Sequence, residues 1–389
     1  MAASPIFPRS FFLLWSVTFL AYFSFQLTTA SLPLYAVSLG ADDAAIGLLT
    51  GVIALGSLVS RPWVGQWLDR GGARWSMPAA GSLFAVSAVG FLLSRAVTDL
   101  IAFRVLSGVA IALLSTSSQV LAIGMAPGER RGEALSLLSL ALGIGQGAGP
   151  GVGIAVARSM SYQGLFATCA VLGVCSTGLA LSLRPLPPQP SPPRTARLIH
   201  PAVMIPGLVL VAVMITFGVN FGLLAVHASR RGLANPGLVF VAYAVGQIST
   251  QALLRRVSDR FGRGAAIGPG LVLTALGMWT LGLVSGWWLL LGALLAGAGQ
   301  GMTQPAIYAL GSDLVAGYER GSAMGTLGVF LEIGIATGAI GGGVVGRAVG
   351  LGTTFLLAGS IAGITGALQR FILGPSQLRR RAGRLQPKQ

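Results

Sequence analysis

The stretch LDRGGAR, from Leu68 to Arg74, returns in altered form as SDRFGRG, from Ser258 to Gly264. Two further stretches, ERRGEAL from Glu129 and ERGSAM from Glu319, are separated by almost the same distance along the chain. Two matches at nearly one shift predict an internal duplication. Each half of the chain is therefore expected to be built on the same plan.

The composition predicts a polytopic membrane protein. The chain has 389 residues, of which 53% are hydrophobic and 9% charged, whereas a soluble domain carries about 25% charged residues. The net charge of +16 does not indicate nucleic-acid binding, because the arginines form short clusters between apolar runs rather than a basic stripe. Glycine is frequent, with 57 residues, as expected where helices pack closely in a bilayer. The two cysteines are expected to be small core residues.

Apolar segments of about 20 residues, long enough to span a bilayer, recur along the whole chain. We predict an all-α membrane protein with 12 transmembrane helices in two pseudo-symmetric six-helix bundles. The first apolar run is too long for a signal peptide and is expected to be a retained helix. The predicted spans are residues 11–37, 44–68, 75–93, 99–124, 133–157, 163–183, 201–228, 235–255, 265–284, 287–312, 321–347 and 352–373.

Four parts of the chain follow from these spans. They are an N-terminal bundle (1–183), a proline-rich linker (184–200), a C-terminal bundle (201–373) and a basic tail (374–389). With a cytoplasmic N-terminus, 19 of the Arg and Lys residues lie in inside segments and 5 in outside segments. The positive-inside rule therefore predicts that both termini and the linker are cytoplasmic, in a bacterial inner membrane.

The stretch GQWLDRGGAR, from Gly65 to Arg74, resembles the loop signature of the major facilitator superfamily, and the resemblance extends over essentially the whole chain. Asp69 lies unfavourably at a helix C-terminus, so a positive element, such as the N-terminus of the span 321–347, should hold it. The resemblance implies a conformational latch; the alternative is a simple positive-inside loop. The latch residues are Gly65, Asp69, Arg70, Gly72 and Arg74, with Asp259 and Arg260 in the second copy.

The segment FRVLSGVA, from Phe103 to Ala110, resembles a second family signature, Arg-x-x-x-Gly. Arg104 lies inside a span, where a charge costs at least about 2.5 kcal/mol and is usually functional. The resemblance implies a role in proton coupling. The alternative is an arginine that snorkels to the outer interface.

The segment GIGQGAGPGVG, from Gly143 to Gly153, resembles the signature of drug and metabolite antiporters within the superfamily. Gly145, Gly149 and Gly153 make a smooth face for helix contact, and Pro150 should bend the helix. A glycine-rich packing helix without a transport role would look similar. The second half has Gly338 at the equivalent place but Ala339 instead of the proline, as the antiporter interpretation expects.

Glu332 is the one acidic residue near the middle of a predicted span. A carboxyl group there is a candidate proton carrier or contact for a cationic substrate, the alternative being a structural hydrogen-bonded acid. Other polar residues in spans are expected to face protein or water rather than lipid. The candidate substrate-cavity residues are Tyr22, Gln26, Thr29, Gln119, Asn220, Tyr243, Gln247, Gln300, Gln304 and Tyr308.

These features predict a secondary active transporter, most simply a proton-coupled exporter of a small organic molecule. The resemblance is to the bacterial 12-helix drug and sugar efflux branch. An importer or uniporter of a sugar or metabolite is the alternative. A membrane-embedded enzyme is remote, because the catalytic motifs and the phosphate loop are missing from the sequence. We expect no metal, no cofactor besides the proton gradient, no nucleic-acid partner, and function as a monomer.

Overall fold

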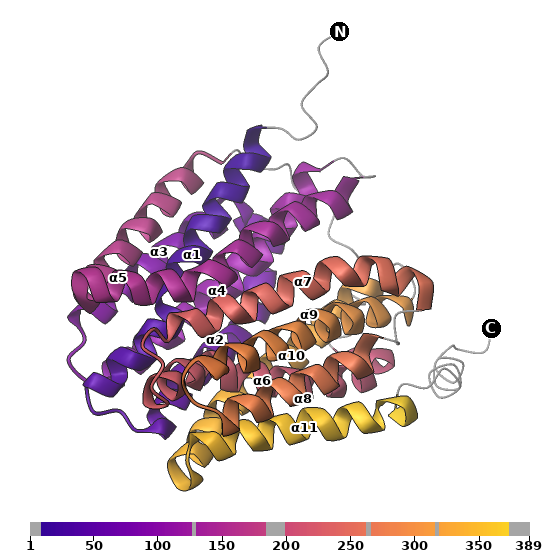
Figure 1. Cartoon of the computed structure of the whole chain (residues 1–389). Helices are drawn as coiled ribbons and strands as arrows, with labels where there is room; N and C mark the ends of the chain where they lie inside the picture. The colour runs from indigo at the N-terminus through magenta and orange to yellow at the C-terminus, as the bar shows by residue number, and fades with distance from the viewer. Residues whose placement is uncertain (1–8, 127–129, 184–198, 262–265, 316–318, 373–389) are drawn as a thin grey trace. The chain divides into compact units, whose positions relative to one another are not determined.

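The computed structural model describes residues 9–126, 130–183, 199–261, 266–315 and 319–372, and within them it leaves out the side chains of Arg9, Asp69 and Arg131 and those of residues 252–261 and 370–372. The described residues form helices and short connections, with no strand among them (Figure 1). The chain divides into two compact units. The first comprises Met1–Ala41 and Val52–Pro192, and the second Asp42–Gly51 and Pro193–Gln389.

The first unit is built around five helices. They are α1 (Arg9–Ser38), α2 (Asp43–Trp67, from Val52 onward), α3 (Ala73–Leu93), α4 (Val97–Met125) and α5 (Arg131–Leu181). α1 packs along α5, and α3 packs against α4 and α5. Phe11, Leu14, Met77 and Phe84 are buried in its core. A π-helical turn, Leu68–Gly72, joins α2 to α3.

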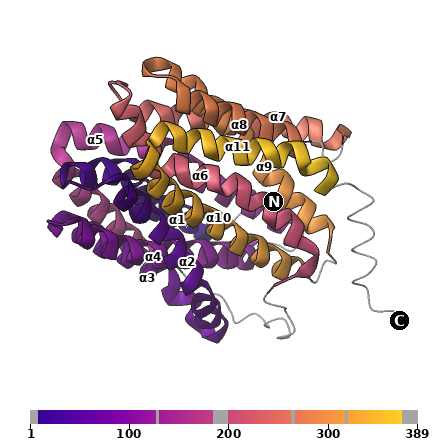
Figure 2. The same ribbon diagram turned by 90° about the horizontal axis from the view of Figure 1, so that it is seen from below.

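The second unit contains α6 (Met204–Arg230), α7 (Gly237–Phe261), α8 (Ile267–Leu283), α9 (Leu289–Asp313), α10 (Arg320–Val349) and α11 (Leu351–Ile372). α6 packs against α10, and α9 packs against both α7 and α8. α11 lies beside α8 (Figure 2). The first turns of α2 group with this unit because Gly47 has no side chain and allows the α10 backbone at Gly343 to approach.

Eight of the described helices are long and apolar enough to cross a membrane: α1–α6, α10 and α11. α8 is a shorter apolar helix. α7 and α9, which carry several of the predicted cavity residues, are not among the eight. Spans predicted at 75–93 and 99–124 agree with α3 and α4 to within two residues. The long helices establish the membrane class.

α5 covers two predicted spans. It consists of two helical stretches that meet at Ser161, whose φ of 76° and ψ of 169° are not helical. This residue lies in the connection predicted between residues 157 and 163. The count of twelve spans and the boundaries of the two bundles stay predictions. Of the predicted linker and tail, residues 184–198 and 374–389 lie outside the described residues.

Candidate functional site

Arg104 of α4 is buried, with 1% of its surface exposed. Its Nη1 donates to the hydroxyl of Thr28 at 3.1 Å, and its Nη2 donates to the Thr28 carbonyl at 2.9 Å. The guanidinium carbon also lies 5.7 Å from the centre of the Phe25 ring and 5.5 Å from that of Phe91. The alternative of an arginine that snorkels outward is therefore wrong. The charge is held inside the first unit by a fork of two hydrogen bonds and two aromatic faces.

The polar stripe on α1 faces α5. The hydroxyl of Thr29 donates to the side-chain oxygen of Gln26 at 3.1 Å, and both residues are buried. Tyr22, one turn earlier, is half-buried against Gly145. Gln119 on α4 is exposed. The structure thus brings Tyr22, Gln26 and Thr29 together on one helix face, and no contact of Gln119 with them is described.

The glycine face predicted on α5 packs against α1. A Cβ at Gly149 would lie 2.5 Å from the Gln26 Cβ, and one at Gly153 would overlap the Leu27 carbonyl. Substitution by any larger residue would therefore push the two helices apart. Pro150 lies within the helix, and the non-helical residue of α5 is Ser161. The packing role of the glycines is established by this contact; their role in antiport stays a prediction.

Glu332 of α10 is buried in the second unit, with 6% of its surface exposed. Two glycines further along the helix bring α10 close to α6: a Cβ at Gly334 would lie 2.9 Å from the Val211 carbonyl, and one at Gly338 would lie 2.7 Å from the Ile215 Cα. The carboxyl group of Glu332 is thus buried in a helix that is apolar enough to span the membrane.

Two buried amides of the second unit have oxygens that accept no hydrogen bond from the described residues: Asn220 Oδ1 and Gln300 Oε1. Asn220 Nδ2 donates to the Met278 sulfur at 3.2 Å, and Gln300 Nε2 contacts the Gln304 side-chain oxygen at 3.4 Å. Both residues are 1% exposed. Buried polar atoms normally find partners, so such exceptions are characteristic of sites that meet water or a ligand.

Three further cavity candidates, Tyr243, Gln247 and Tyr308, lie on α7 and α9. Tyr243 on α7 is buried, and its ring centre lies 5.7 Å from that of Phe221 on α6. Gln247, one turn further, is half-buried, as is Tyr308 on α9. The polar candidates thus lie in both units: Tyr22, Gln26, Thr29 and Gln119 in the first, and the others in the second.

The predicted latch is only partly described. Arg70 and Arg74 are exposed. A Cβ at Gly65 would meet nothing within 4 Å, so the structure shows no close packing at this glycine, whereas one at Gly72 would collide with Trp67. The side chains of Asp69, Asp259 and Arg260 lie outside the described part of the chain. The latch itself stays a prediction.

Two ion pairs were missed by the sequence analysis. Arg230 Nη1 lies 2.8 Å from Asp43 Oδ1, and Arg347 Nη1 lies 3.0 Å from Asp42 Oδ2. All four residues belong to the second unit. The sequence offered a weak signal, because the two acids and both arginines fall at predicted outer ends of spans. Among the described side chains, no three His, Cys, Asp or Glu residues gather as a metal site.

An all-helical chain with many apolar spans, a buried arginine and a buried acid is a polytopic membrane protein of the transporter class. The sequence profile of the Major Facilitator Superfamily matches residues 14–234 and 208–388. The chain belongs to the Major Facilitator Superfamily. This is a family of transporters, so the membrane-enzyme alternative is set aside.

Individual relatives agree with this assignment. An uncharacterized MFS-type transporter of Pseudomonas aeruginosa strain UCBPP-PA14 is 26% identical over 368 residues, which cover 90% of each chain. The staphylopine export protein of Staphylococcus aureus is 23% identical over 263 residues, or 63% of this chain and 65% of that protein. A crystal structure of a bacterial homolog of the human lysosomal transporter Spinster superposes with a TM-score of 0.81 at 14% identity, covering 98% of this chain and 99% of that one.

Proposed function

We propose that this transporter is a proton-coupled exporter of a small organic molecule. It works by alternating access of two six-helix bundles in a bacterial inner membrane, with both termini cytoplasmic and as a monomer. The proton gradient is its energy source, and it needs no cofactor. The observation that carries the proposal is the burial of Glu332 in α10.

A carboxylate at the centre of a membrane helix costs about 2.5–3.5 kcal/mol. In the proposed cycle Glu332 takes up a proton in the conformation that is open to one side of the membrane. It releases the proton in the conformation that is open to the other side. This alternation would link one proton to each transport cycle. Arg104, buried and positively charged in the first unit, would tune the site without carrying the proton.

The proposed substrate class rests on two buried amide oxygens that accept no hydrogen bond from the described residues. The free amide oxygens of Asn220 and Gln300 are acceptors, and Tyr243 is an aromatic neighbour. We propose a neutral or weakly cationic amphiphile with N–H or O–H donors. The outward direction is supported by the staphylococcal relative, which is named as an export protein.

The test uses inside-out membrane vesicles and ethidium as a cationic probe. The wild-type chain should accumulate ethidium when the lumen is acidic and lose this accumulation when nigericin collapses the pH gradient. Glu332→Gln should lose at least about 90% of gradient-driven accumulation, since an amide cannot release a proton. Glu133→Gln is the matched control, because Glu133 is a surface carboxylate that pairs with Arg130 at 3.2 Å.

Each other result has a defined meaning. Gradient-driven accumulation by Glu332→Gln at the wild-type level would exclude the proton role. Uptake only in right-side-out vesicles would favour the alternative, an importer or uniporter. No ethidium movement in either orientation would contradict the proposed substrate class.

A further inference from the structure

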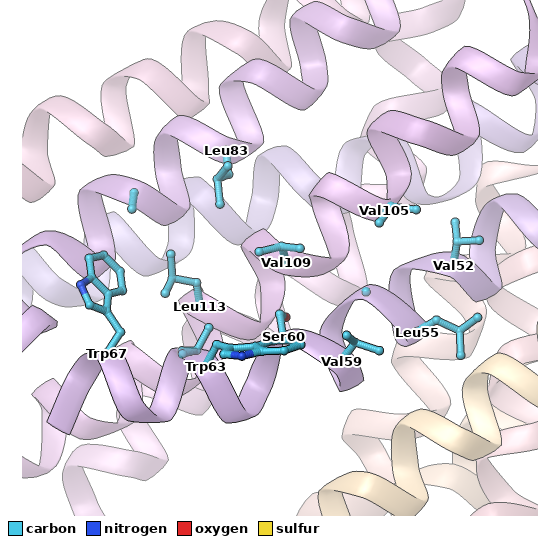
Figure 3. A pocket seen from close by; sticks show the side chains of 13 residues that line it. Val52, Leu55, Val59, Ser60, Trp63, Trp67, Leu83, Val105, Val109 and Leu113 are labelled. Carbon is cyan, nitrogen blue, oxygen red and sulfur yellow. The ribbon is translucent and has the colours of Figure 1, made fainter. Parts of the chain in front are cut away.

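An apolar groove runs between α2, α3 and α4 within the first unit, and Figure 3 shows its lining side chains. Its volume is about 760 Å³, which is within the range of about 300–1,000 Å³ found for ligand pockets. Val59 and Trp63 line it from α2, Leu83 from α3, and Val109 and Leu113 from α4. The lining of the groove includes neither Arg104 nor Glu332 and none of the candidate substrate-cavity residues.

The groove offers a ligand almost no hydrogen-bonding groups. Its one hydroxyl group, that of Ser60, already donates to the carbonyl of Ser57 at 3.1 Å. The side chains of Val59 and Val105 are about half exposed, at 56% and 42%. A polar substrate would lose its hydration here without compensation. A hydrocarbon chain makes no hydrogen bonds with water, so it would lose none on entering the groove.

One end of the groove carries two tryptophans. Trp63 is 64% exposed and Trp67 is 39% exposed. The Trp67 indole nitrogen would lie 2.7 Å from a Cβ at Gly72, so this ring packs directly on the turn that joins α2 to α3. Exposed tryptophans at a helix end are typical of the level of the lipid headgroups. This end of the groove is therefore its headgroup end.

Two exposed arginines follow immediately. Arg70 lies on the turn that packs on Trp67, and Arg74 is the second residue of α3, with its guanidinium 5.3 Å from the Trp75 ring centre. Exposed guanidinium groups beside the headgroup level bind phosphate well, because their planar donors match phosphate oxygens. The groove thus has an apolar lining and a cationic end.

We propose that this groove is a specific site for an anionic phospholipid of the bilayer. One acyl chain lies along Val59, Leu83, Val109 and Leu113, and the headgroup phosphate binds Arg70 and Arg74. An anionic headgroup is favoured over a zwitterionic one, because Arg70 and Arg74 are both exposed, on and just after the turn that packs on Trp67.

The experiment is native mass spectrometry of the full chain released from nanodiscs that contain equal amounts of phosphatidylglycerol and phosphatidylcholine. The wild-type chain should retain one phosphatidylglycerol per chain in preference to phosphatidylcholine. Ala79→Phe fills the groove from α3 and should abolish this retention. Val86→Phe is the matched control, because Val86 is exposed on the same helix and outside the groove. If Ala79→Phe does not fold, Val109→Phe fills the groove from α4.

A second pair of variants tests the headgroup. Arg70→Gln with Arg74→Gln should weaken phosphatidylglycerol binding about 30-fold, at about 1 kcal/mol per basic residue near the membrane surface. Arg95→Gln with Arg158→Gln removes two exposed arginines elsewhere in the unit and should change nothing. Equal retention of both lipids, undiminished retention in the filled grooves, or unchanged selectivity without Arg70 and Arg74 would each overturn the proposal. None of these readouts depends on transport.

Discussion

Replacing Arg104 by methionine separates the functional from the structural reason for a buried arginine. An arginine within a membrane helix costs up to about 2.5–3.5 kcal/mol, the value at the helix centre; Arg104 lies nearer the N-terminal end of α4. Its contacts offset this: two interhelical hydrogen bonds to Thr28, worth about 0.6–1.7 kcal/mol each in a membrane. The contacts with the rings of Phe25 and Phe91 add about 1–2 kcal/mol. The gains and the cost nearly cancel.

Methionine fills a similar apolar space and carries no charge. The hydroxyl of Thr28 keeps its own acceptor, the carbonyl of Phe25 at 2.7 Å, so no new unsatisfied hydroxyl results. We therefore expect Arg104→Met to change the free energy of unfolding by no more than about 1 kcal/mol. Gradient-driven transport of ethidium in vesicles should nevertheless fall at least about tenfold.

Arg104→Lys is the informative comparison. Lysine keeps the charge but cannot make the fork of two bonds or stack its plane on the rings. It should therefore be less stable than Arg104→Met by about 1–2 kcal/mol. Unfolding in SDS, followed by circular dichroism, measures both differences. A loss above about 3 kcal/mol in Arg104→Met, or wild-type transport in that variant, would refute the reasoning.

Two further predictions concern helix packing and the ion pairs. Gly153→Val should destabilise the chain by about 1–3 kcal/mol through overlap with the Leu27 carbonyl. Gly143→Val, on the same helix where a Cβ meets nothing within 4 Å, should cost less than about 1 kcal/mol; equal losses in SDS unfolding would contradict the contact. Asp43→Arg and Arg230→Asp should each destabilise the chain. The double variant, which again pairs opposite charges, should recover about 0.5–1 kcal/mol in a double-mutant cycle. No recovery would mean that the pair contributes nothing.

Hydropathy predicted the long helices well, because an apolar segment must match the thickness of the bilayer whatever it packs against. It could not predict which residues meet. The partners of Arg104, namely Thr28, Phe25 and Phe91, lie on other helices and are common residue types with no motif of their own. A predicted span gives the depth of a charge in the membrane but not the side chains that surround it.

The contacts at the ends of the spans were harder to predict, for a different reason. Asp42 and Asp43 look like ordinary loop acids, and their pairing with Arg347 and Arg230 depends on how helices far apart in sequence approach one another. The apolar groove was equally hidden. Val59, Leu83 and Val109 are unremarkable in a membrane helix, and only their spacing in three dimensions leaves a channel between them.

The duplication itself shows where function should be sought. Within the first unit Gly149 packs on Gln26, and within the second Gly338 packs on Ile215; both contacts are related by the same shift of 189 residues. This contact therefore occurs in both halves, and glycine is needed at both positions because a Cβ there would collide with the neighbouring helix. Chemistry does not repeat: the partner is an amide in one copy and a hydrocarbon in the other. Some residues differ between the two halves, above all Arg104 and Glu332. The repeated helix packing does not require them, so they are the residues that a transport cycle can use.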